Sequence, residues 1–201
     1  MTMPWTTEST RTAYENSWIR VREDRVIRPD GAPGIYGVVE LRWPAVFVVA
    51  LTDADEVVLV TQHRYATGAL SIEVPAGASD GEDPLVAAQR ELLEETGLRA
   101  REWVRVGGMD ALNGVAKAPE HVFVARGLTG APSLRGTGGS DAPHSAGTVG
   151  GRSASQVEEG ISRVEAVPFA EVLAMISAGT IRDGETIAAL ALAGLWLGRF
   201  A

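Results

Sequence analysis

The chain has 201 residues, of which 45% are hydrophobic and 22% charged, a composition that argues against a disordered or fibrous protein. Its 26 acidic residues outnumber the 18 basic ones, and the net charge of −8 argues against nucleic acid or an anionic membrane as a partner. Because the chain contains no cysteine, a disulfide scaffold, a thiolate zinc site and a cysteine nucleophile are excluded.

The ends of the sequence carry no targeting or membrane signal that we can recognise. Residues 1–18 lack a basic stretch followed by an apolar run, and the longest apolar segment, 187–197, is too short to span a bilayer. We therefore expect a cytoplasmic protein with no membrane partner.

The apolar pattern predicts strands and helices that interleave along the chain. Residues 18–28 alternate apolar and charged side chains, as a half-buried strand does, whereas residues 45–51 are continuously apolar and predict a central strand covered on both faces. Asp83, Pro84 and Gly97 are the N-cap, first-turn proline and terminating glycine of a predicted helix. Strands are expected at 18–28, 35–41, 45–51, 57–64, 71–77, 103–109, 121–125 and 161–167, and helices at 83–96, 168–177 and 184–198.

This order of elements predicts the α/β (α+β) class, a sandwich with a mixed sheet. Residues 129–156 are dominated by Gly, Ser, Ala, Thr and Pro and have no apolar period, which predicts a flexible loop. We expect residues 1–201 to form a single domain from which this loop emerges.

The predicted helix at 83–96 carries an unusual group of carboxylates. At about 100° per residue, Glu91, Glu94 and Glu95 share one narrow sector, with Arg90 beside them. Like charges at this spacing repel, which favours a compensating partner, and hard divalent cations prefer such oxygen ligands. The alternative is an acidic helix face that is simply solvated. The buried face of this helix is expected to consist of Leu85, Val86, Ala88, Leu92 and Leu93.

The surrounding sequence favours the metal site. Residues 90–98, Arg-Glu-Leu-Leu-Glu-Glu-Thr-Gly-Leu, resemble the core of the Nudix box, the motif of the Nudix hydrolases. One departure lies in the loop before the helix, where four residues separate Gly77 from Glu82 and the family pattern has five. We expect the shorter loop to alter the position of the Ala76 and Gly77 backbone and to leave the carboxylates of the helix unaffected.

Outside the box, the chain resembles the ADP-ribose pyrophosphatase branch of this family over residues 15–128 and 158–197. The markers are Gln-His-Arg-Tyr at 62–65, Glu-Val-Pro-Ala-Gly at 73–77 and Ile-Arg-Asp at 181–183. The resemblance implies a Nudix-type α/β/α sandwich. It also implies a homodimer in which N-terminal strands, here within residues 12–41, contribute to the site of the partner.

The resemblance further implies the reaction and its metal. The reaction would be hydrolysis of a nucleoside diphosphate linked to another moiety, first of all ADP-ribose, giving AMP and ribose 5-phosphate. Mg²⁺, or alternatively Mn²⁺, would bind the Ala76 carbonyl, Glu91 and Glu95, with Glu94 as a further ligand or a group that orients water. Glu159, at the end of the glycine-rich segment, is the candidate general base; the alternative is a solvated acid at a loop end.

Five further residues are implied as substrate contacts. Arg64 matches the family arginine that contacts phosphate, a role that suits a bidentate guanidinium, although a surface salt bridge is the alternative. Trp18 and Tyr36 align with aromatic positions that sandwich adenine, although either ring could instead belong to the core. Glu73 and Asp110 complete the set.

The identity of the substrate is left open by the sequence. Many ADP-ribose-specific relatives have a proline about fifteen residues after the box, whereas here the first proline is Pro119. The alternatives are therefore another nucleotide sugar, a dinucleotide, or a Nudix module that senses a nucleotide without cleaving it. The chain lacks the G-x-S-x-G and P-loop motifs that would favour a serine hydrolase or a P-loop enzyme.

Overall fold

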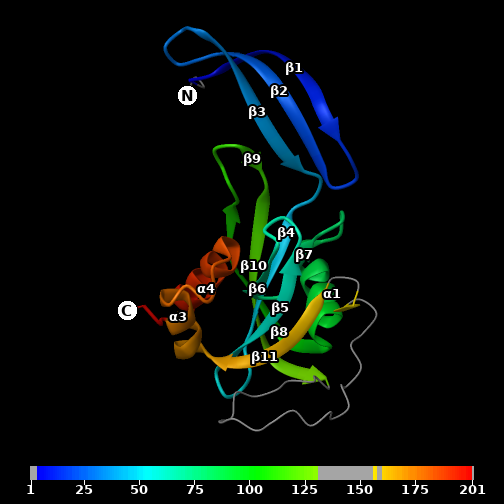
Figure 1. The fold of residues 1–201 in the computed structure, drawn as a ribbon. Helices are drawn as coiled ribbons and strands as arrows, with labels where there is room; N and C mark the ends of the chain where they lie inside the picture. Colours follow the sequence, from blue (N-terminus) through cyan, green and yellow to red (C-terminus); the bar gives the residue numbers. More distant parts are fainter. Residues whose placement is uncertain (1–3, 131–155, 158–159, 201) are drawn as a thin grey trace.

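The computed structural model describes residues 4–130, 156–157 and 160–200, which form three β-sheets and the helices α1, α3 and α4 (Figure 1). The N-terminal sheet has the order β1-β2-β3-β9; its first three strands are antiparallel and β9 runs parallel to β3. Its strands are β1 (Thr6–Glu15), β2 (Ile19–Ile27), β3 (Pro33–Leu41) and β9 (Ala116–Lys117).

The other two sheets lie between helices. One has the order β7-β4-β10-β8 and is mixed, because β4 and β10 are parallel while the other pairs are antiparallel. The third sheet, β11-β5-β6, is antiparallel. The elements are β4 (Ala45–Ala50), β5 (Glu56–Arg64), β6 (Ala69–Glu73), β7 (Ala76–Ala78), α1 (Pro84–Thr96), β8 (Leu98–Asp110), β10 (Pro119–Gly130), β11 (Ile161–Pro168), α3 (Phe169–Ser177) and α4 (Gly184–Trp196).

Strand β4 is covered on both faces, as its continuous apolar sequence predicted. Successive side chains of a strand point to opposite faces. Val46 and Val48 accordingly join the core cluster that includes Leu92 of α1, whereas Phe47 and Val49 join the cluster that includes helix α4. Figure 1 shows α1 on one side of the sheets and α3 and α4 on the other. The predicted sandwich with a mixed sheet is thus confirmed.

Helix α1 begins and ends where its caps predicted. The Asp83 side chain accepts a hydrogen bond from the Leu85 N–H at 2.9 Å, and Pro84 occupies the first turn. Gly97 adopts a left-handed conformation (φ 75°), and its N–H donates to the Leu93 carbonyl at 2.8 Å. These two caps fix the length of the helix that carries the acidic residues.

Replacing Asp83 with Ala is expected to lower the free energy of unfolding by about 1 kcal/mol, because the N–H that the carboxylate now satisfies loses its partner. Urea denaturation would measure the change. The matched control is Asp53→Ala, in an exposed turn. Equal stabilities for the two variants would contradict the assigned cap.

Several boundaries differ from those expected. Strand β1 was not predicted, because its ten residues are all exposed and its sequence has no apolar face. The interval 71–77 is not one strand: it holds the end of β6, two connecting residues and the beginning of β7. The predicted loop at 129–156 begins too early, since Thr129 and Gly130 end β10 and pair with Arg99 and Leu98. Residues 131–155 lie outside the described part of the chain.

The N-terminal sheet extends away from the sandwich in Figure 1 and leaves large apolar side chains uncovered. Tyr14, Trp18 and Ile35 are 55%, 73% and 69% exposed. Within the part of the chain that the structure describes, no helix combines the length and the apolar character that crossing a membrane requires.

Candidate active site

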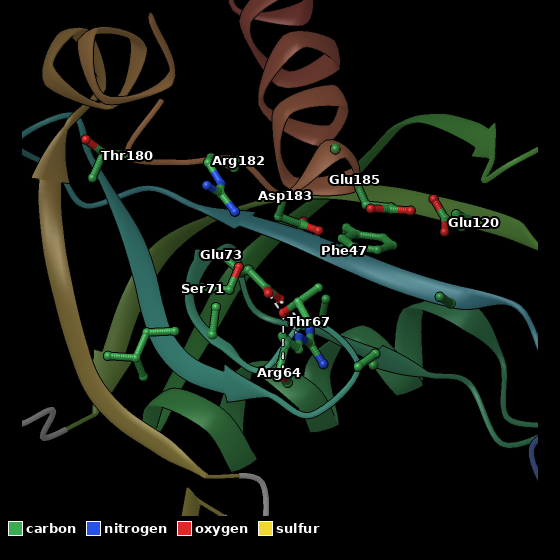
Figure 2. Close-up of a pocket in the computed structure, with 17 residues that line it drawn as sticks. Phe47, Arg64, Thr67, Ser71, Glu73, Glu120, Thr180, Arg182, Asp183 and Glu185 are labelled. Carbon is green, nitrogen blue, oxygen red and sulfur yellow. Dashed lines mark hydrogen bonds and ion pairs between the residues drawn. The ribbon is translucent and has the colours of Figure 1, made fainter. Parts of the chain in front are cut away.

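A cavity of about 530 Å³ opens where the β5–β6 hairpin, β7, β10 and the start of α4 meet (Figure 2). This volume is typical of small-molecule sites. Both charged and apolar side chains line the cavity. Its wall includes Phe47, Arg64, Glu73, Ala76, Gly77, Glu120, Arg182, Asp183 and Glu185.

Arg64 and Glu73 form a charged pair in the cavity wall. The Arg64 Nε donates to Glu73 Oε1 at 2.9 Å, and a second guanidinium nitrogen bonds the other carboxylate oxygen. Glu73 is only 3% exposed and also accepts a hydrogen bond from Gln62. The hydrogen bond from Arg64 to Glu73 is the main cause of the raised pKa of Arg64. The guanidinium is therefore held in place by a buried carboxylate while remaining half exposed to the cavity.

Two carboxylates of α1 point toward the sheet. Glu91 and Glu95 are 5% and 2% exposed, so this part of the acidic sector is not a solvated helix face. The Ala76 N–H donates to Glu95 Oε2 at 3.0 Å. A Cβ atom on Gly77 would lie 2.2 Å from Glu91 Oε1, so any other residue there would displace the Glu91 carboxylate from its present position.

The buried face of α1 is consequently displaced from the one expected. Val86 is 49% exposed rather than buried, whereas Ala87 and Thr96 are buried with the two carboxylates. The helix is rotated so that acidic side chains, rather than only apolar ones, contact the strand.

Arg90 partly neutralises this acidic sector. One guanidinium nitrogen donates to Glu91 Oε1 at 2.8 Å and to Glu94 Oε2 at 3.1 Å, and the Nε donates to Glu82 at 2.9 Å. Among the described residues, no three His, Cys, Asp or Glu side chains are gathered as a metal site requires. The carboxylate donors still suit a hard divalent cation chemically, and Gly77, which has no Cβ, leaves room for the Glu91 carboxylate beside the strand. A cation would compete with Arg90 for Glu91 and Glu94.

The loop that is one residue short closes through a tight turn. Asp80 and Gly81 both have positive φ, at 50° and 86°, and the Glu82 N–H donates to the Ser79 carbonyl at 2.8 Å. Two consecutive left-handed residues reverse the chain in few steps. The contacts of α1 with the backbone of β7 are therefore present despite the shorter loop.

A second acidic group, which the sequence analysis did not identify, lines the same cavity. Glu120 of β10 is 5% exposed, and burial raises its pKa to about 7, with further contributions from the charges of Glu185, Asp183 and Asp110. Burial also raises the pKa of Glu185. Glu120 is the second residue of β10, just before the apolar stretch of that strand, and no sequence motif there distinguishes it from a surface acid.

The remaining predicted site residues lie elsewhere. Trp18 and Tyr36 belong to the N-terminal part and do not line the cavity of their own chain; the Tyr36 ring packs edge-on against Trp5 at 5.4 Å. Asp110 ends β8 and acts on Glu120 through its charge. Glu159 lies outside the described residues.

Comparison with known proteins identifies the class of protein to which this fold and site belong. Residues 41–190 match the family model of the NUDIX domain, and residues 5–39 match that of the nucleoside diphosphate sugar hydrolase N-terminal domain. The chain therefore belongs to the Nudix family, whose members generally use divalent metal ions and act on small nucleoside diphosphate substrates.

Three curated relatives illustrate the range of the family. The chain is 36% identical over 124 residues to an ADP-ribose pyrophosphatase of Mycobacterium tuberculosis (strain ATCC 25618 / H37Rv), covering 61% of this chain and 59% of the relative. It is 34% identical over 125 residues to a methanol dehydrogenase activator of Bacillus methanolicus, covering 61% and 66%. It is 33% identical over 138 residues to a GDP-mannose pyrophosphatase of Escherichia coli O1:K1 / APEC, covering 65% and 62%.

The chain thus spans less than two thirds of the length of these relatives. A solved structure titled as an ADP compounds hydrolase superposes with a TM-score of 0.75 at 20% identity, covering 97% of this chain and 96% of that one. This similarity shows that the two chains share a fold.

Proposed function

We propose that the protein is a metal-dependent pyrophosphatase that hydrolyses a nucleoside diphosphate linked to another moiety. ADP-ribose, cleaved to AMP and ribose 5-phosphate, is the first candidate substrate. The observation that carries the proposal is the burial of Glu91 and Glu95 of the Nudix helix against Ala76 and Gly77, whose backbone forms part of a small-molecule cavity. Relatives named ADP-ribose pyrophosphatase and GDP-mannose pyrophosphatase support the same reaction class.

In this proposal, Glu91, Glu94, Glu95 and the Ala76 carbonyl hold Mg²⁺, with Mn²⁺ as the alternative. When bound, the ion supplies positive charge that polarises the phosphoanhydride. Glu95 also accepts the Ala76 N–H, which couples the helix to the strand at the cavity. Arg90 limits the repulsion among the carboxylates before substrate arrives.

The arginines of the cavity bind the diphosphate. Arg64 presents a half-exposed guanidinium whose orientation Glu73 fixes. Arg182 lies exposed at the start of α4 and makes no ion pair with another residue that the structure describes. Glu159 remains our candidate for the general base. In its support, the Gln156 side chain, nearby in sequence, donates to the Glu95 carbonyl at 2.7 Å.

We further propose a homodimer formed through the N-terminal strands within residues 12–41. The exposed apolar side chains of that sheet would be covered by a second copy, and Trp18 and Tyr36 would reach the cavity of the partner to stack on the adenine. Light scattering would test the predicted molar mass. The cytoplasmic location expected from the sequence stays a prediction.

The decisive experiment is incubation with Mg²⁺ and a panel of ADP-ribose, GDP-mannose, another nucleotide sugar, NADH and a diadenosine polyphosphate, with products separated by chromatography. We expect AMP and ribose 5-phosphate from ADP-ribose. If only another compound of the panel is cleaved, the proposed reaction stands and the proposed substrate is wrong. Absence of cleavage with Mg²⁺ and with Mn²⁺ would overturn the proposal and favour a nucleotide-sensing module.

A further inference from the structure

One part of the cavity carries acidic side chains that the proposed metal chemistry does not use. Glu120, on β10, and Glu185, in the first turn of α4, point toward one another beside the Phe47 ring (Figure 2). Glu120 is 95% buried, and its Oε2 is a buried atom without a hydrogen-bond partner in the part of the chain that the structure describes.

This arrangement is unfavourable in the free protein. Buried carboxyl oxygens are normally hydrogen-bonded, and leaving such an acceptor without a donor costs free energy. The pKa of Glu120 is raised for the same reason, by burial and by the charges of Glu185, Asp183 and Asp110. Burial and the neighbouring Asp183 also raise the pKa of Glu185. A ligand that supplies hydrogen-bond donors would relieve this cost.

The geometry favours neutral donors over a metal ion. Of the acidic side chains beside Glu120, that of Asp183 already accepts the Thr186 N–H. The N-terminus of α4, which begins at Gly184 after the Asp183 cap, also carries the positive end of the helix dipole, and this opposes a bound cation. Hydroxyl groups, by contrast, donate to carboxyl oxygens without bringing charge.

The rest of the cavity indicates what bears these hydroxyls. Arg64 and Arg182 present guanidinium groups that suit phosphate oxygens, whereas Glu120 and Glu185 present acceptors. Phe47 and Ala45 add an apolar surface between the charged groups. A cavity that combines phosphate-binding arginines with acidic acceptors fits a phosphorylated sugar.

We propose that Glu120 and Glu185 form the subsite for the sugar moiety of the substrate and accept hydrogen bonds from its hydroxyl groups. This inference rests on the proposed function, because it assigns a binding site to the moiety that the diphosphate links to the nucleoside. It makes the two residues determinants of substrate specificity, distinct from the carboxylates of α1.

The test compares ADP-ribose with the β-methyl ester of ADP, which has the same diphosphate but no sugar hydroxyl at that end. For Glu120→Leu we expect the ratio of the two kcat/KM values, ADP-ribose over methyl ester, to fall at least tenfold. The control Glu102→Leu, exposed on β8, should keep the ratio of the unaltered protein. An unchanged ratio in Glu120→Leu, with normal folding by circular dichroism, would overturn the inference.

Calorimetry provides a readout that does not require turnover. Ribose 5-phosphate should bind the unaltered protein more tightly than methyl phosphate does, and Glu120→Leu should lose at least tenfold in affinity for ribose 5-phosphate. If the protein cleaves no diphosphate but this loss is observed, the proposed reaction fails while the sugar subsite stands. If it cleaves ADP-ribose but ribose 5-phosphate binds both proteins equally, the subsite alone is wrong.

Discussion

Replacing Glu95 with Gln is expected to lower kcat/KM for ADP-ribose by about 10²- to 10³-fold, because one carboxylate charge that would hold the metal is removed. The neutral side chain keeps an oxygen that can accept the Ala76 N–H, so the contact between α1 and β7 should survive. Steady-state kinetics at the Mg²⁺ concentration that just saturates the unaltered protein would measure the loss, and thermal unfolding would show that the fold is intact.

The matched control is Glu102→Gln, which removes the same charge from an exposed position on β8 and should leave kcat/KM unchanged. Raising the Mn²⁺ or Mg²⁺ concentration should restore part of the activity of Glu95→Gln if the loss lies in metal affinity. Near-normal turnover by Glu95→Gln at low metal concentration would show that the metal ligands are misassigned.

The sequence predicted those features of the fold that have local causes. Asp83, Pro84 and Gly97 determine the ends of α1 through hydrogen bonds and conformations within a few residues. The continuous apolar run of β4 predicted a strand covered on both faces, because no alternation is needed where both sides are core. The order of residues 90–98 identified the family from one helix.

Features with distant causes were missed. Strand β1 has only exposed side chains and exists because its backbone pairs with β2, from Thr6 opposite Ile27 to Glu15 opposite Arg20. The Glu91 carboxylate is buried beside Gly77, at a place that a Cβ atom on residue 77 would occupy. A prediction from the apolar period assigns acidic residues to the solvent-facing side of a helix. It therefore assigned Val86 to the buried face of α1 and could not predict that Glu91 and Glu95 are buried.

The second acidic group shows the same limit at the site. Glu120 lies far in sequence from the 183–185 segment, and their proximity depends on how α4 packs against the sheet. The Thr186 hydroxyl accepts the Val74 N–H at 3.2 Å, which fixes the start of α4 beside the cavity. No local pattern in the sequence encodes that contact.

Replacing Glu120 with Leu is expected to stabilise the protein, and more so at pH 8 than at pH 5. The pKa of Glu120 is about 7 in the folded protein against an ordinary value of 4.5. Between these values the folded state binds more protons than the unfolded state, so the free energy of unfolding falls as the pH rises. The destabilising contribution of Glu120 is therefore nearly absent below pH 4.5 and complete above pH 7.

Removing the carboxyl group removes this contribution, so the gain in free energy of unfolding should be about 2 kcal/mol larger at pH 8 than at pH 5. Urea denaturation at both pH values would measure it, with Glu102→Leu, at an exposed position, as the control measured at the same two pH values. Equal gains at the two pH values would contradict the assigned burial. A more stable variant that also binds ribose 5-phosphate less tightly would show that the buried acid is retained for ligand binding at a cost in stability.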